Sequence, residues 1–90
     1  MLTDYIQAAM RRAHYELLDD QPDEPYVGTI PDLQGVIAIG SSLEACREQL
    51  QSALEEWLLV GIWLGHAIPP IDGIDINRPA TPIQPIPEAA

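Results

Sequence analysis

The sequence has no lysine and only four arginines, against fourteen aspartates and glutamates in 90 residues. The formal net charge of −10 makes a surface that repels phosphate backbones, so we expect no direct binding to nucleic acid. The share of hydrophobic residues, 47%, is nevertheless too high for a disordered acidic protein. A chain of this length predicts one small folded domain.

The single cysteine, Cys46, excludes an internal disulfide framework and any CxxC zinc or redox site. The longest wholly apolar run, 57–64, has eight residues, whereas a membrane-spanning helix needs about 20. Asp4 stands where a signal peptide would carry positive charge. We therefore expect a soluble cytoplasmic protein without a membrane partner, and we expect no cofactor.

The spacing of apolar residues changes along the chain from a helical to a strand-like period and back. The predicted elements are a helix at 2–13, strands at 14–19, 26–30 and 36–39, a long helix at 43–64 and a short edge strand at 73–77. The short proline-containing turn at 20–25 makes the first two strands antiparallel, and the wholly apolar third strand is predicted to be buried on both faces. This α-β-β-β-α-β order predicts an α+β fold in which an antiparallel sheet packs on one long helix.

The domain is predicted to span 1–78, followed by a flexible tail at 79–90 with four prolines in twelve residues. At the start of the long helix, Ser41 and Glu44 fit a capping box, and Ser42 is the competing cap. Gly65 is predicted to end this helix.

The second half of the long helix is apolar on all sides, which a domain this small cannot cover alone. Trp63 lies about 240° around the helix from Trp57, so the two indoles face different directions. We predict a homo-oligomer, a dimer or tetramer, that uses the residues facing away from the core. These residues are Leu59, Val60, Ile62 and Trp63.

Several short motifs, in their order and spacing, resemble the HicB-like antitoxin family over residues 13–78. They are Tyr15-Glu16, Ile30-Pro31-Asp32-Leu33-Gln34-Gly35, Gly40-Ser41-Ser42-Leu43-Glu44, Ala53-Leu54-Glu55-Glu56-Trp57-Leu58, Gly65 and Ile68-Pro69-Pro70. The resemblance implies a partial RNase H-like fold and neutralisation of HicA toxins, which are small basic mRNA interferases. Many members also carry a C-terminal DNA-binding module; none is expected after Asn77, so this chain alone is not expected to repress its own operon.

Seven acidic residues and no arginine lie between Ala13 and Cys46. Solubility alone can account for such a charged surface. Together with the resemblance, it predicts an acidic surface that steers to a basic HicA-like toxin and masks it, with no enzymatic activity of its own. The candidate partner-binding residues are Glu16, Asp19, Asp20, Asp23, Glu24 and Asp32.

The sequence leaves two other functions open. The first is a homo-oligomeric structural or regulatory protein without a toxin partner. The second, suggested by the RNase H resemblance, is a residual metal-dependent nuclease, which would need several carboxylates converging on metal ions. The sequence has no arginine between Arg12 and Arg47 that could hold a substrate phosphate. Neither His14 nor His66 has a serine or cysteine at the spacing of a known catalytic motif. We therefore assign no catalytic or metal-binding residue.

Overall fold

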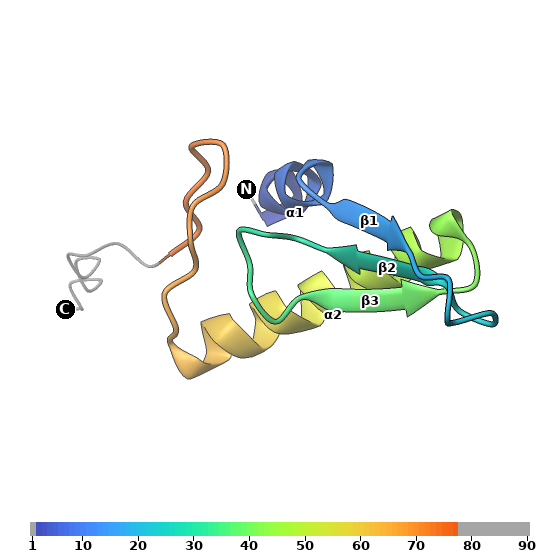
Figure 1. Cartoon of the computed structure of the whole chain (residues 1–90). Helices are drawn as coiled ribbons and strands as arrows, with labels where there is room; N and C mark the ends of the chain where they lie inside the picture. Colours follow the sequence, from blue (N-terminus) through green and yellow to red (C-terminus); the bar gives the residue numbers. More distant parts are fainter. Residues whose placement is uncertain (1, 78–90) are drawn as a thin grey trace, which may run out of the picture.

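The computed structural model describes residues 2–77 of the chain. Its elements are α1 (Leu2–Arg11), β1 (His14–Leu17), β2 (Tyr26–Thr29), β3 (Ile37–Gly40) and α2 (Leu43–Leu64). The strands form one antiparallel sheet in the order β1-β2-β3, with α2 crossing behind it and α1 next to the start of β1 (Figure 1). The α+β class is confirmed. The predicted tail at 79–90 lies outside the described residues.

Only one face of the sheet is covered by α2. Gly28 belongs to the covered face, since a Cβ added there would lie 3.2 Å from the sulfur of Cys46 on α2. On the opposite, open face, Ile37 and Ile39 are 57% and 49% exposed. The prediction that the third strand is buried on both faces is therefore wrong, because no second layer covers the sheet in the described part of the chain.

Both ends of α2 are set by local backbone chemistry. The hydroxyl oxygen of Ser42 accepts a hydrogen bond of 3.0 Å from the backbone N–H of Ala45, so Ser42 is the N-cap. The predicted capping box of Ser41 and Glu44 is wrong, because the helix starts one residue later than that box requires. At the other end, Gly65 has a φ of 77° and stops the helix as predicted.

The core lies between the two helices, the loops that follow β2, and the segment 66–77. It contains Tyr5, Ala8 and Ala9 of α1, Leu50, Leu54 and Leu58 of α2, and Ile30, Leu33, Val36, Ile68 and Ile71. The predicted edge strand at 73–77 is wrong: Ile71 and Ile74 pair across a tight turn instead. The positive φ angles of Asp72 and Gly73, 51° and 79°, reverse the chain there.

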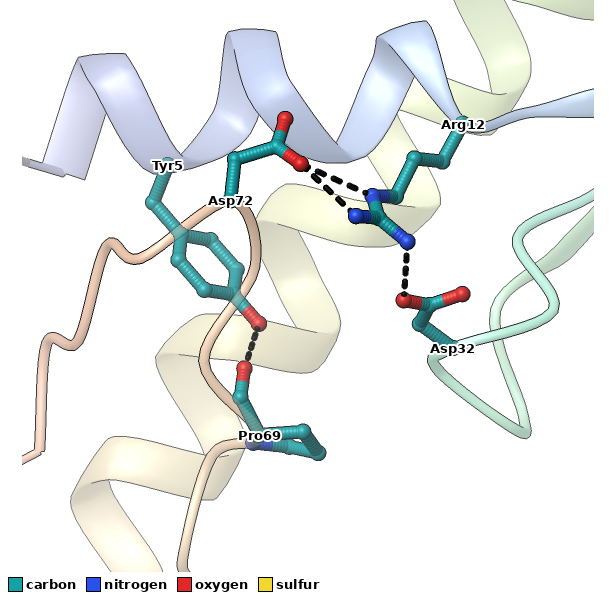
Figure 2. Close-up of polar contacts among 5 residues, drawn as sticks. All are labelled: Tyr5, Arg12, Asp32, Pro69 and Asp72. Carbon is teal, nitrogen blue, oxygen red and sulfur yellow. Dashed lines mark hydrogen bonds and ion pairs between the residues drawn. The ribbon is translucent and has the colours of Figure 1, made fainter.

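The phenol of Tyr5 ties α1 to the segment after α2. Its hydroxyl donates a 2.5 Å hydrogen bond to the backbone oxygen of Pro69 (Figure 2). Burial, with smaller contributions from the charges of Asp32 and Asp75, raises the pKa of Tyr5 above its usual value. The neutral phenol is therefore the form that the folded state favours.

This arrangement predicts a loss of stability in alkaline solution. An unfolded tyrosine ionises near pH 10, so the stabilising contribution is complete below that pH and decreases as the pH rises above it. Tyr5→Phe should cost about 1 kcal/mol at neutral pH through the lost hydrogen bond and should flatten the alkaline decrease. Urea unfolding between about pH 8 and 11 measures both effects. Equal slopes for the two proteins would contradict this account.

Candidate functional site

Five predicted partner-binding carboxylates gather at one end of the sheet, which we call the acidic hairpin. Its residues are Glu16 on β1 and Asp19, Asp20, Asp23 and Glu24 in the β1–β2 connection. All five are exposed, and none forms an ion pair with an arginine among residues 2–77. A 2.7 Å hydrogen bond from the backbone N–H of Leu18 to the backbone oxygen of Pro25 joins the two ends of the connection. The acidic residues between them therefore lie on a closed turn.

Asp32, the sixth predicted residue, lies elsewhere. It follows the opposite end of β2, and its carboxylate accepts a 2.9 Å hydrogen bond from Arg12. The same guanidinium donates to Asp72, at 2.7 Å, so that Arg12 lies between two carboxylates (Figure 2). The hydrogen bond and charge of Asp72, followed by the charge of Asp32, raise the pKa of Arg12. Asp32 is thus engaged in a structural ion-pair network rather than grouped with the acidic hairpin.

Arg12 joins the end of α1 to the loop after β2 and to the turn at 71–74, which are far apart in the sequence. We predict that Arg12→Met lowers the melting temperature by about 2–5 °C in low salt and by less in high salt, because all three side chains are partly exposed to the screening ions. Arg11→Met is the matched control, since Arg11 forms no ion pair with the described residues. Scanning calorimetry at two ionic strengths measures the difference; equal shifts for both variants would contradict the assignment.

A second exposed surface, the α2 patch, consists of the four predicted interface residues Leu59, Val60, Ile62 and Trp63. All four are exposed, and Trp63 is the most exposed of them at 85%. Trp57, in contrast, is partly buried against the core, where Gly35 lies beside its indole. The prediction that the two indoles face different directions is confirmed, and the α2 patch faces solvent.

The nucleophilic and metal-ligating residue types do not assemble a reactive site within residues 2–77. Cys46 is buried, its sulfur lies 3.7 Å from the Ala38 oxygen, and burial raises the pKa of the thiol. A thiol in such a setting stays protonated and packs as a small apolar group. Across the described part of the chain, no three histidine, cysteine or acidic side chains are grouped so that they could hold a metal ion.

Neither α1 nor α2 is both long and apolar enough to cross a membrane. The acidic hairpin and the α2 patch are two surfaces of the described chain that could recognise a partner. One would attract cations, and the other would bury apolar area.

Comparison with known proteins finds a matching family, a relative named after that family, and a solved structure of the same fold. A family described as UPF0150-like matches residues 4–69. A UPF0150 protein of Thermotoga maritima is 38% identical over 47 residues, which make up 51% of this chain and 63% of that relative, less than two thirds of its length. The crystal structure of TTHA0281 from Thermus thermophilus is 50% identical in sequence and superposes with a TM-score of 0.79, covering 87% of this chain and 94% of that one.

Proposed function

The chain belongs to the UPF0150-like family, and we propose that it is a HicB-like antitoxin, a non-enzymatic protein that binds a small basic mRNA interferase and masks its RNA-binding surface. The resemblance of residues 13–78 to HicB-like antitoxins names the class of partner. Because an mRNA interferase acts on cytoplasmic messages, the proposal also places the chain in the cytoplasm.

The observation that carries the proposal is the acidic hairpin. Five exposed carboxylates, none of them neutralised by an arginine of residues 2–77, form a negative surface at one end of the sheet. A toxin that binds RNA needs a positive surface, and a negative protein surface of complementary shape can occupy it in place of the phosphates. The net charge of −10 adds a long-range attraction to any such cationic partner.

Salt dependence tests this electrostatic mechanism. Raising the ionic strength from about 0.05 to 0.5 M shortens the Debye length from about 14 to 4 Å. We expect association with the proposed basic toxin to slow by about tenfold or more, while dissociation changes little. Stopped-flow fluorescence measures both rates. Association that is indifferent to salt would contradict the mechanism.

The exposure of Trp63 favours a second candidate function, self-assembly into a structural or regulatory homo-oligomer through the α2 patch. Large exposed apolar groups are enriched in protein interfaces. Trp63→Asp should then weaken assembly and leave the melting temperature nearly unchanged, because the indole makes little contact with the core. Trp57→Asp is the contrasting variant, expected to destabilise the fold by placing a charge against the core. Light scattering and thermal melts separate the two effects.

A further inference from the structure

Strand β3 is one of the two edge strands of the sheet, and its outer edge is not paired with any described strand. Such an edge presents backbone N–H and C=O groups ready to bond another strand, and proteins usually protect it with lysine, proline or a bulge. Ile37–Gly40 has none of these devices: its four residues pair with β2 in unbroken register and carry no charge. This edge is chemically open to strand addition.

The surroundings of β3 are suited to contact with an equally acidic molecule. Residues 33–43 are uncharged over eleven consecutive positions, in a chain whose net charge of −10 makes copies repel one another elsewhere. On the open face, Ile37 and Ile39 are exposed and lie beside Thr29 and Val27 of β2. The opposite edge strand places His14 and Glu16 on that same face. Apolar area and low charge therefore coincide at the β3 edge.

A groove runs along this edge between β3 and α2. It has a volume of 620 Å³, and its α2 side is formed by Ala45, Gln49, Ser52, Ala53 and Glu56. Three of these side chains are small, which leaves room for a second helix to approach. Glu24 and Glu56 are the charged groups that line the groove, so a second copy would add like charges at its rim.

We propose that two copies of this chain pair antiparallel along β3, about a two-fold axis that passes between their Ala38 residues. In antiparallel strands, directly opposed residues point to the same face. Ile37 of one copy then lies opposite Ile39 of the other, and both α2 helices cover the same side of one six-stranded sheet. The α2 faces that border the groove meet across the axis. This interface is separate from the α2 patch and does not depend on the toxin proposal.

The register makes a specific cross-linking prediction. Opposed Cα atoms in an antiparallel pair lie about 4.5–5.5 Å apart, within the range that a disulfide accepts. Ile37→Cys mixed with Ile39→Cys should therefore form a covalent dimer on mild oxidation, whereas either variant alone should link at least about tenfold less. Non-reducing electrophoresis of the full chains measures the yield. Self-linking of Ile39→Cys as efficient as the mixture, or no linking at all, would overturn the proposal.

Solution mass gives an independent test on the intact chain. Ile37→Lys combined with Ile39→Lys places like charges opposite each other in the proposed pair and should halve the assembly mass relative to wild type, whose protomer is 9.9 kDa. Both positions are exposed, so the melting temperature should change little. Leu59→Lys combined with Trp63→Lys is the matched control on the α2 patch: a mass halved by the β3 variant supports the proposal whatever this control does. A monomeric wild type, or a β3 variant of unchanged mass, would overturn it.

The direction of the salt effect separates this contact from toxin binding. A rise in ionic strength screens the repulsion between Glu24 and Glu56 of one copy and those of the other, so self-association should become tighter. Attraction to a basic partner should become weaker under the same change. Sedimentation velocity of the chain alone at about 0.05 and 0.5 M salt measures this. Dissociation of the dimer at the higher salt concentration would contradict pairing through β3.

Discussion

Gly40→Ala is expected to destabilise the fold strongly, although it adds only one methyl group. A Cβ at this position would lie 2.5 Å from the backbone nitrogen of Cys46 and 2.7 Å from its Cα. These are backbone atoms in the first turns of α2, so relief requires the helix to move away from β3. Overpacking of this kind costs about 1–3 kcal/mol, and we expect the upper end of that range because no flexible side chain can yield. Urea unfolding measures the loss.

Ser41→Ala is the matched control for this variant. Ser41 is the next residue, is exposed, and makes no hydrogen bond that caps α2, since Ser42 does so. Its replacement should change the free energy of unfolding by less than about 0.5 kcal/mol. A Gly40→Ala variant as stable as this control would contradict the close approach of β3 to the backbone of α2 at Cys46.

Neutralising the acidic hairpin is expected to have the largest effect on partner binding. Changing Asp19, Asp20, Asp23 and Glu24 to their amides removes four charges from one turn. Because long-range attraction acts on the encounter of the two proteins, association with the basic partner should slow by about tenfold or more at low salt. The fold should be unaffected, since all four side chains are exposed.

Two double variants that remove the same number of charges separate the effect of the acidic hairpin from the effect of the net charge. Asp20→Asn with Asp23→Asn, and Glu48→Gln with Glu55→Gln, each remove two negative charges. The hairpin pair should slow association several-fold more than the α2 pair, because only the hairpin lies on the proposed contact surface. Equal effects in stopped-flow measurements would mean that net charge alone attracts the partner.

Local patterns in the sequence predicted the parts of the fold that depend on near neighbours. The stripe that includes Leu50, Leu54 and Leu58 predicted the buried face of α2, and Gly65 predicted its end. The segment at 71–77 is harder to predict, because Ile74 and Ile76 alternate like a strand, whereas positive φ angles at 72 and 73 turn the backbone. Alternation over so few residues does not separate a strand from a turn.

In the candidate site, too, contacts between residues close in the sequence could be predicted, whereas contacts between distant residues could not. The acidic hairpin could be predicted because its acids are close in sequence and turns are exposed. Asp32 belongs to the same acidic stretch, yet a strand of the sheet separates it from the hairpin and brings it to Arg12. Arg12 lies 20 positions from Asp32 and 60 positions from Asp72, and no local pattern in the sequence predicts such a pairing.

Inhibition of RNA cleavage tests most directly the proposal that this chain masks a basic RNA-cleaving partner. The assay combines a purified HicA-type mRNA interferase as the proposed toxin, a labelled RNA, and increasing amounts of the acidic chain. We expect cleavage to stop near one equivalent of the wild-type chain, a larger amount of the acidic-hairpin variant to be needed, and the acidic chain alone to leave the RNA intact. Cleavage that continues in the presence of excess wild-type chain, or RNA cleavage by this chain itself, would contradict the account.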